Sequence, residues 1–527
     1  MSVSANYLAL ARIEGFLTES ARKFPHKTAF IQQKNQLTYA ELDRKSENFA
    51  QHLRSSGLQR GDRVLIFLPN CLEVVIGIFG ILKAGGVFST INPGTKAEKL
   101  RYIEQNSEAA FLVTNGALVR IASETSLASE RIYVTGAAVK DAPYLAFEDA
   151  LQDNLSNEPL PVGGIDTDLA MLVYTSGSTG VPKGVMMQHR NICFAANSIN
   201  TYLRNTSDEV IMLTLPISFD YGLYQVFLAT QLGATVVLEQ GFTFPAAILN
   251  SAREHQVTNF PMVPTMAALL ISMKNLSTDG LDSLRCFTNT GAALPPGHIQ
   301  KLKTLFPKTV MYSMYGLTEC KRCTYIEPDE LEQRPDSVGK AIPYTEVFIV
   351  DKQDKILGAG ETGELVIRGS HVMSGYWKNP QATAKAIRPH PLYNWEKVLY
   401  SGDLFRQDEA GYLYFIARKD DIIKSRGEKI SPKEIENVLY ALANVKEAII
   451  IGIPDEILGH TLKAIIVPVD ETLTEREVIA HCRAQLEPYM VPQQVEFRSI
   501  LNKTASGKID RTHVTSTHHT KQNQLSI

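Results

Sequence analysis

The sequence lacks features that would assign it to several common classes of protein. Its 527 residues include only six cysteines, too few for a disulfide framework in a chain of this length. Its strongest apolar run, Val74 to Leu82, is far shorter than the roughly 20 residues of a membrane-spanning helix. The net charge is −3, with no excess of basic residues. No membrane span and no nucleic-acid partner are therefore expected.

The N-terminal residues also lack the basic segment followed by an apolar segment that marks a secretory signal. A cytoplasmic location is therefore expected. The hydrophobic fraction of 44% and the charged fraction of 21% are typical of a globular protein. The length predicts two or more domains.

Short apolar segments alternate with amphipathic ones over most of the chain. Arg63 to Leu68, Val87 to Asn92 and Ala110 to Thr114 are predicted strands with helices between them, and a further helix is predicted over Gly222 to Leu232. This alternation predicts an α/β fold whose large N-terminal domain has two parallel-type sheets flanked by helices. Strand-like segments separated by Asp/Gly-rich turns predict a small β-rich subdomain over about 345–415.

A charged stretch, Ala417 to Lys429, precedes a second and shorter α/β alternation. It predicts a domain boundary, with an N-terminal domain over 1–419 and a small mobile α+β lid domain over 420–527. Within the lid, Ser431 and Glu434, with Pro432 between them, predict a capping box at a helix start. Thr474 and Glu477 predict a second one.

The segment YTSGSTGVPKGV, Tyr174 to Val185, follows an apolar run and is rich in serine, threonine and glycine. Such a turn offers backbone N–H groups and hydroxyl groups to phosphate oxygens, and Lys183 adds a positive charge. It lacks the Walker spacing, because Gly184 follows Lys183. Taken alone, it is also compatible with a flexible surface loop.

Further motifs occur downstream in a fixed order: YGLTE (Tyr315 to Glu319), GELVIRG with Glu364, YSGDL with Asp403, RKDDIIKSRGEKI and NKTASGKIDR with Lys508. LTYAEL and KAGGVFSTINP precede the phosphate loop. Together these motifs resemble those of the AMP-forming adenylating enzymes, a superfamily of acyl-CoA synthetases, peptide-synthetase adenylation domains and luciferases. The resemblance covers nearly the whole chain. It implies ATP and Mg2+ as cofactors.

The resemblance implies roles for particular residues. Lys508, Glu319 and Thr175 would be catalytic, with Glu319 as the magnesium ligand, a role that suits a hard oxygen donor. Tyr315 would stack on adenine, while Asp403 and Arg418 would contact the ribose. The implied ATP- and AMP-binding residues are Thr175, Ser176, Gly177, Ser178, Thr179, Gly180, Lys183, Gly291, Ala292, Ala293, Tyr315, Gly316, Thr318, Asp403 and Arg418.

The resemblance also implies two half-reactions. A carboxylate would first attack ATP to give an acyl-adenylate and pyrophosphate, with Lys508 bridging the carboxylate and the α-phosphate. The lid would then rotate about the hinge residue Asp420. Lys424 and Gly427 would next line a thiol channel, and a thiol would displace AMP.

The acid itself is harder to infer. In PISFDYGLYQ, Asp220 follows Phe219, as in amino-acid adenylation domains, where the aspartate pairs with the α-ammonium group of the substrate. Acyl-CoA ligase-like proteins with the same S-F-D remain an alternative, and so does a plain helix cap. We predict an amino-acid substrate, with L-proline as the first choice, and keep as the alternative an acyl-CoA ligase for a small carboxylic acid.

The motif alignment also implies the residues of the substrate pocket. They are Asp220, Tyr221, Tyr224, Pro261, Met262, Thr288, Thr290, Met314, Arg322 and Cys323. Arg322 is unusual beside an apolar pocket, and it either meets an acidic substrate or points away. Cys320 and Cys323 form a C-x-x-C, but no second pair accompanies them, so a redox or metal role is not favoured.

No carrier module is recognisable around the adenylation region, so a stand-alone enzyme is expected. Its thiol would belong to a separate carrier protein or to coenzyme A, and an amino-acid substrate favours the carrier protein. A non-catalytic nucleotide sensor on the same scaffold is the alternative from another class. The joint presence of Lys508, Glu319 and Asp403 argues against the sensor.

Overall fold

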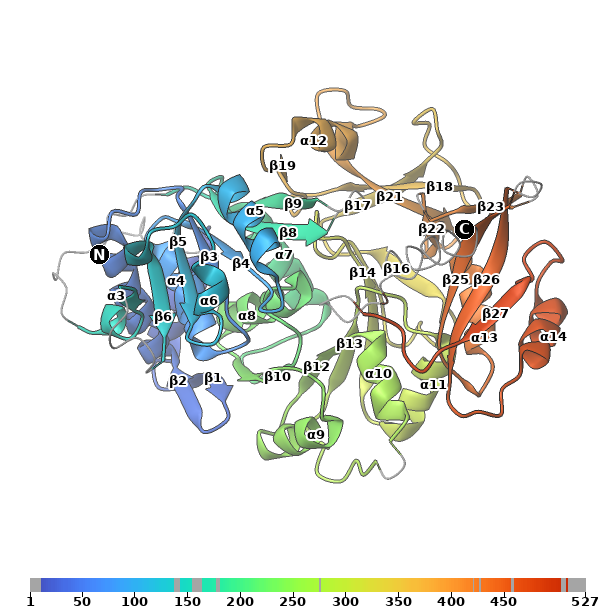
Figure 1. The fold of residues 1–527 in the computed structure, drawn as a ribbon, viewed down its shortest axis with the longest axis horizontal. Coiled ribbons are helices and arrows are strands. Elements are labelled where there is room, and N and C mark those ends of the chain that lie inside the picture. Colours follow the sequence, from blue (N-terminus) through green and yellow to red (C-terminus); the bar gives the residue numbers. More distant parts are fainter. Residues whose placement is uncertain are drawn as a thin grey trace, which may run out of the picture.

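The computed structural model describes residues 11–136, 143–153, 164–176, 181–273, 276–419, 421–425, 428–455, 459–503 and 509. In Figure 1 a helix-covered sheet lies at one end of the molecule and a separate C-terminal unit at the other. A second and larger sheet lies between them. Alternating strands and helices over most of the chain confirm the predicted α/β class.

The smaller of the two main sheets has eight strands in the order β19-β9-β8-β4-β3-β5-β6-β7. The run from β8 to β7 is parallel, while β9 and β19 are added in antiparallel fashion. The strands are β3 Arg63–Ile66, β4 Val87–Thr90, β5 Ala109–Asn115, β6 Ile132–Thr135, β7 Leu145–Ala146, β8 Leu169–Ser176, β9 Pro182–Gln188 and β19 Gly375–Tyr376.

The larger sheet has 14 strands and joins the parallel part of the chain to the predicted β-rich region. Its parallel run is β1-β11-β10-β12-β13-β14, and from β14 onward the strands pair in antiparallel fashion. The strands are β1 Thr28–Gln32, β2 Asn35–Thr38, β10 Val210–Leu213, β11 Thr235–Leu238, β12 Asn259–Met262, β13 Cys286–Asn289, β14 Val310–Tyr315, β15 Thr324–Ile326, β16 Ser337–Ala341, β17 Glu346–Val350, β18 Thr362–Arg368, β20 Ile387–Pro389, β21 Lys397–Gln407 and β22 Leu413–Arg418.

Two helices are buried along most of their length, α4 (Leu72–Lys83) and α8 (Asp220–Leu232). A helix that is apolar on every side belongs inside a protein, and both carry almost no charge after their first turn. The other helices before residue 420 are α2 Ile13–Lys23, α3 Tyr39–Ser55, α5 Ala97–Ser107, α6 Val119–Ala122, α7 His189–Tyr202, α9 Pro245–Glu254, α10 Pro264–Ile271, α11 Pro296–Leu305 and α12 Pro380–Ala386.

The C-terminal unit has its own hydrophobic core, which includes Ile435, Leu439, Ala464 and Ile466. Its three-stranded sheet has the order β25-β26-β27, with a small separate ladder of β23 and β24. Its elements are β23 Ile423–Ser425, β24 Glu428–Ile430, α13 Pro432–Tyr440, β25 Val445–Asp455, β26 Gly459–Pro468, α14 Glu475–Gln485 and β27 Gln494–Phe497. This arrangement matches the predicted small α+β unit.

The two predicted capping boxes have different outcomes. Thr474 and Glu477 form the predicted box at the start of α14. At the start of α13 the prediction of a box was wrong, although Pro432 does occupy the first turn. The hydroxyl group of Ser431 donates instead to the carbonyl oxygen of Ile416 at 2.5 Å, so this side chain ties α13 to β22 rather than capping its own helix.

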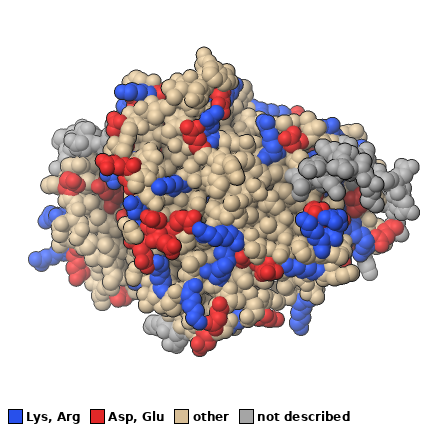
Figure 2. Space-filling model, turned by 180° about the vertical axis from the view of Figure 1, so that it is seen from behind, with Lys and Arg blue, Asp and Glu red and all other residues tan. Residues whose placement is uncertain are grey.

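Within the described ranges, no helix is both long enough and apolar enough to cross a bilayer. On the face shown in Figure 2, acidic and basic side chains are interspersed rather than gathered by sign. This face therefore presents no extended field of one sign for a polyanionic partner.

Candidate active site

The YGLTE motif forms a closed turn directly after β14. Tyr315 is the last residue of that strand, and its carbonyl oxygen accepts a 3.0 Å hydrogen bond from the backbone N–H of Cys323. Gly316 permits this closure, because a Cβ atom there would lie 1.7 Å from the carbonyl oxygen of Lys321. The turn therefore fixes Thr318 and Glu319 between the two ends of a short loop.

Tyr315 and Asp403, predicted to bind the adenine and the ribose, are in direct contact. The phenolic hydroxyl group of Tyr315 donates a 2.5 Å hydrogen bond to Oδ2 of Asp403. Arg418 faces Asp403 across the β21–β22 ladder, with its Nε 3.7 Å from Oδ1. Burial raises the pKa of Asp403 to about 6, and the charge of Arg418 and the Tyr315 hydroxyl group oppose this rise.

Glu364 supports the turn that carries Asp403. Its Oε1 accepts a 3.0 Å hydrogen bond from the backbone N–H of Gly402, and its Oε2 lies 2.5 Å from Nζ of Lys419 and 3.2 Å from Arg388. Glu364 thus pairs with Lys419 and Arg388 and at the same time holds the backbone of the Asp403 turn.

Lys183 and Glu319 are linked through Tyr376, a residue that the sequence reasoning missed. The hydroxyl group of Tyr376 donates a 2.7 Å hydrogen bond to Oε1 of Glu319, and Nζ of Lys183 lies 5.5 Å from the centre of the same ring. The short pairing of β19 with β9 brings Tyr376 to this position. No local motif marks it, because the strand partner lies almost 200 residues away in the sequence.

The predicted phosphate loop is described only in part. Thr175 lies near the end of β8, opposite Lys183 of β9. The backbone of Ser176 ends β8, while Gly177, Ser178, Thr179 and Gly180 lie outside the described residues. The antiparallel pairing of β8 with β9 places Thr175 and Lys183 side by side.

The parallel strands β12, β13 and β14 end at one edge of the large sheet, in register at Met262, Asn289 and Ser313. Gly291, Ala292 and Ala293 follow β13 at that edge. The side-chain amide of Asn289 donates to the carbonyl oxygen of Ala292 at 3.1 Å, and Gly291 has a φ of 86°. Ligands of open α/β sheets bind beyond this edge of the strands.

The predicted pocket residues lie around the same edge and are buried. The hydroxyl group of Tyr221 donates to Thr288, and that of Tyr202 lies 2.8 Å from Sδ of Met314. Arg322 is buried beside them, and its guanidinium carbon lies 4.4 Å from the centre of the Tyr221 ring. The remaining predicted members with buried side chains are Tyr224, Pro261, Met262, Thr290 and Cys323.

Asp220 does not act as a helix cap. Helix α8 begins at Asp220 itself, two residues before the predicted start, and Phe219 holds the N-cap position without a side-chain cap. The capping alternative was therefore wrong. The Asp220 side chain is buried, and its charge acts on its neighbours Tyr224 and Lys321.

Lys321 is the second residue that the sequence reasoning missed. Its side chain is buried, and its charge lies close enough to Asp220 and Glu319 for both to affect its pKa. Burial lowers that pKa, and the two carboxylates oppose the change. Two consecutive basic residues, Lys321 and Arg322, follow YGLTE after only one intervening residue and could have signalled it.

Three further predicted functional residues, in addition to those of the phosphate loop, lie outside the described parts of the chain: Lys508, Asp420 and Gly427. Lys424 lies in β23, where only its backbone is described. All six cysteines are free thiols, and among the described residues no group of His, Cys, Asp and Glu side chains could hold a metal ion by itself. Cys320 and Cys323 thus remain buried thiols in the turn.

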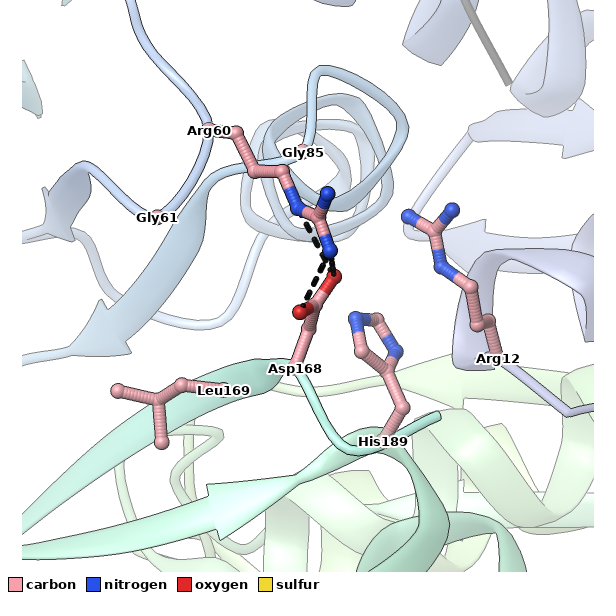
Figure 3. Close-up of a pocket in the computed structure, with 7 residues that line it drawn as sticks. All are labelled: Arg12, Arg60, Gly61, Gly85, Asp168, Leu169 and His189. Carbon is pink, nitrogen blue, oxygen red and sulfur yellow. Dashed lines mark hydrogen bonds and ion pairs between the residues drawn. The ribbon is translucent and has the colours of Figure 1, made fainter. Parts of the chain in front are cut away.

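A cavity of about 280 Å³ lies apart from this site, at the opposite end of β8 (Figure 3). Asp168 pairs there with Arg60 through hydrogen bonds of 2.6 to 3.1 Å, while His189 lies between Asp168 and Arg12. Burial lowers the pKa of His189 to about 3, so this imidazole is neutral. Seven residues of strand place Thr175 roughly 23 Å away.

The donors and acceptors around Tyr315 fit a nucleotide. Asp403 offers a carboxylate held by Tyr315, and Glu319 offers a carboxylate whose second oxygen accepts no hydrogen bond from the described residues. A hard oxygen ligand of this kind suits Mg2+, which in phosphate sites takes one or two carboxylates and substrate oxygens. The carboxylate of Glu319 is therefore a sufficient protein ligand for a Mg2+ ion whose other ligands come from the triphosphate of ATP.

Comparisons with known proteins agree with this geometry. Residues 17–377 match the model of the AMP-binding enzyme family, and residues 434–508 match that of the AMP-binding enzyme C-terminal domain. The chain is 32% identical to a long-chain-fatty-acid–CoA ligase of Bacillus subtilis strain 168, over 97% of this chain and 96% of that protein.

Solved structures give the same result. The anthranilate CoA ligase AuaEII in complex with anthranoyl-AMP has a TM-score of 0.88 at 25% identity, over 97% of this chain and 98% of that one. O-succinylbenzoate coenzyme A synthetase from Bacillus subtilis, in complex with ATP and magnesium ion, has a TM-score of 0.82 at 26% identity, over 95% and 99%.

Proposed function

The chain belongs to the family of AMP-binding enzymes and is an AMP-forming acid–thiol ligase, and from this premise we propose that it joins a small carboxylic acid to coenzyme A. The observation that carries the proposal is the turn from Tyr315 to Cys323. It places Glu319 beside Tyr376 and Lys183, and Tyr315 against Asp403. In this proposal one short turn orients both the nucleoside end and the phosphate end of ATP.

Asp403 and Arg418 would bind the ribose hydroxyl groups, and the ring of Tyr315 would lie against the adenine. Asp403 is buried and already receives one hydrogen bond, so a carboxylate oxygen remains to accept from the ribose. Glu364 would keep the Asp403 turn in place through its bond to Gly402. These contacts bind the part of ATP that does not react.

The reaction begins between two anions, a carboxylate and the α-phosphate. The site must therefore supply positive charge and oriented donors where charge develops. Glu319 would hold Mg2+, which neutralises phosphate charge when bound. Lys183 and Thr175, side by side at the phosphate loop, would contact the departing pyrophosphate, and Lys508 would bridge the carboxylate and the α-phosphate.

The second half-reaction would use the C-terminal unit. We propose that it rotates about Asp420, withdraws Lys508, and presents the Lys424–Gly427 segment to the thiol. The separate hydrophobic core of this unit allows it to move as one body. The thiol would attack the acyl carbon, and AMP would leave with the electron pair of the broken bond.

The relatives support coenzyme A as the acceptor, because they are named as CoA ligases. The amino-acid substrate predicted first, with a carrier protein as acceptor, stays as a second candidate. The buried carboxylate of Asp220 favours it, since a buried ammonium group needs such a counter-ion. Lys321 weighs against it, because that ammonium group already lies in the field of Asp220.

The test is pyrophosphate exchange into ATP with the purified chain, followed by thioester formation. The panel contains amino acids, including L-proline, and short aliphatic and aromatic carboxylic acids. We expect exchange with a carboxylic acid that has no α-amino group, and AMP release on adding coenzyme A. Exchange with L-proline, and transfer only to a carrier protein, would select the second candidate. If the chain binds ATP but no acid gives exchange or AMP, the enzyme proposal fails.

A further inference from the structure

Three buried polar atoms without partners lie together at the start of α8. They are Oη of Tyr224, Nζ of Lys321 and Nε of Arg322, and none of them has a hydrogen-bond partner among the described residues. The side chains of Lys321 and Arg322 are 1% and 3% exposed. Buried polar atoms are nearly always hydrogen-bonded, so such a group requires an explanation.

The contacts between these side chains show that they form one cluster. Nζ of Lys321 lies 5.7 Å from the centre of the Tyr224 ring, and the guanidinium group of Arg322 lies over the Tyr221 ring. Tyr221 and Tyr224 are three positions apart in α8, so their side chains lie on the same face of the helix. The charges of Asp220 and Arg322 both act on Tyr224. Tyr224 thus lies among all three charged side chains.

The cluster holds more basic than acidic side chains. Lys321 and Arg322 are its two buried basic residues, and Asp220 is its one buried acidic residue. No ion pair of Lys321 or Arg322 occurs within the part of the chain that the structure describes. Glu319 also acts on Lys321, but it is bonded to Tyr376 and faces the phosphate end of the nucleotide site. Basic side chains thus outnumber acidic ones in this buried cluster, and a buried cation is unfavourable unless a partner is supplied.

The chemistry of the atoms defines the missing partner. Lysine and arginine side chains only donate hydrogen bonds, and the tyrosine hydroxyl group can donate one as well. The ligand must therefore bring acceptor atoms and one negative charge. A carboxylate meets both conditions, and its planar form suits arginine in particular. A substrate ammonium group in this position would instead lie beside two basic side chains, which disfavours it.

The cluster is adjacent to the proposed reaction site. Lys321 is separated from Glu319 by one residue, and Tyr221, Tyr224 and Arg322 belong to the predicted pocket. We propose that Tyr224, Lys321 and Arg322 bind a second anionic group on the acid substrate, so that the enzyme activates acids with two carboxylates or an equivalent anionic substituent. This inference rests on the proposed function and specifies its substrate class.

The wild-type enzyme gives the first test, which does not depend on any variant folding. Pyrophosphate exchange is measured with two pairs: hexanoate against adipate, which have equal chain length, and benzoate against terephthalate, which adds a para-carboxylate group. We expect kcat/KM to be about 100-fold or more higher for a diacid, since a site with buried donors rejects analogues that leave them unpaired. A preference for hexanoate over adipate and for benzoate over terephthalate would overturn the inference and leave the ligase proposal intact.

Variants give the second test. Lys321→Met and Arg322→Met keep side-chain length but remove the charge, and Lys352→Met at an exposed lysine is the matched control. We expect diacid kcat/KM to fall about 100-fold in the two Met variants, and by much more than monoacid kcat/KM, while Lys352→Met changes neither. Arg322→Lys, which keeps the charge, should retain part of the diacid preference.

Thermal stability separates a binding role from a structural one. Removing a buried and unpaired cation should leave Tm unchanged or raise it. A lower Tm with equal loss for both acids would show that the cations serve folding and would overturn the inference. If no acid in the panel supports exchange, both this inference and the ligase proposal fail.

Discussion

The hydroxyl group of Tyr315 donates a 2.5 Å hydrogen bond to Oδ2 of Asp403 across 88 residues of sequence. Tyr315 ends β14, and Asp403 lies in β21, so this bond joins the parallel and antiparallel parts of the large sheet. The ring also packs edge-on against Phe405, with a centroid separation of 4.9 Å. A side chain held at both its ring and its hydroxyl group is well suited to position a nucleotide.

Asp403→Asn should weaken ATP binding. Asparagine can still accept the bond from Tyr315, but it loses the charge that strengthens hydrogen bonds from the ribose. We expect the KM for ATP to rise about 10- to 100-fold, in line with about 1.5–3 kcal/mol for hydrogen bonds to a charged group. Steady-state kinetics and AMP titration measure the change. An unaltered KM for ATP would contradict the assignment of Asp403.

The same variant should become more stable at neutral pH. Burial raises the pKa of Asp403 to about 6, above the unfolded value near 4. The folded state therefore binds more protons in this window, and the contribution of Asp403 to stability falls as pH rises from about 4 to about 6. Above that window the penalty is about 3 kcal/mol, because each pKa unit corresponds to about 1.4 kcal/mol. Asp403→Asn should raise Tm at pH 7.5 and leave it unchanged at pH 4; a lower Tm at pH 7.5 would refute this.

Gly316→Ala should disrupt the turn. The added Cβ atom would lie 1.7 Å from the carbonyl oxygen of Lys321, and backbone atoms cannot rotate away as a side chain can. We expect loss of more than 100-fold in exchange activity, as about 1 Å of misplacement already costs that much. Gly297→Ala is the matched control, because its Cβ would have no atom within 4 Å. Equal behaviour of the two variants would show that the turn tolerates displacement.

Tyr376→Phe should reduce adenylation through Glu319. It removes the 2.7 Å hydrogen bond to Oε1 and keeps the ring that faces Lys183. We expect a fall of about 10-fold in exchange rate, and a higher Mg2+ concentration for half-maximal rate. Tyr344→Phe, at a side chain that is 81% exposed, serves as the control. A normal magnesium dependence would separate Tyr376 from the role of Glu319.

Lys508→Ala should affect the two half-reactions unequally. Lys508 is proposed to bridge the carboxylate and the α-phosphate during adenylation only, and to be withdrawn afterwards. We expect pyrophosphate exchange to be nearly abolished, while thioester formation from preformed acyl-adenylate continues at close to the normal rate. Lys503→Ala, whose side chain pairs with Glu447, is the nearby control. Equal loss in both half-reactions would remove Lys508 from this role.

The sequence by itself determined the elements that depend on neighbours in the chain. The alternation of apolar segments predicts the α/β class, and Thr474 with Glu477 predicts the start of α14, because both ends of a capping box lie within one helical turn. The order of the motifs indicates an adenylating enzyme, and each motif can be recognised from residues that are close together in the sequence. The family match over residues 17–377 and 434–508 agrees with that reading.

The tertiary structure decided what depends on distant partners. Ser431 bonds to Ile416 rather than capping α13, and α8 starts at Asp220, because packing outweighs weak local preferences. The contact of Tyr376 with Glu319 follows from the pairing of β19 with β9. Burial of Lys321 and Arg322 follows from the closed turn above α8. The sequence shows that Lys321 and Arg322 are basic but not that they are buried. The hypothesis that the acid substrate carries a second anionic group therefore depends on the fold.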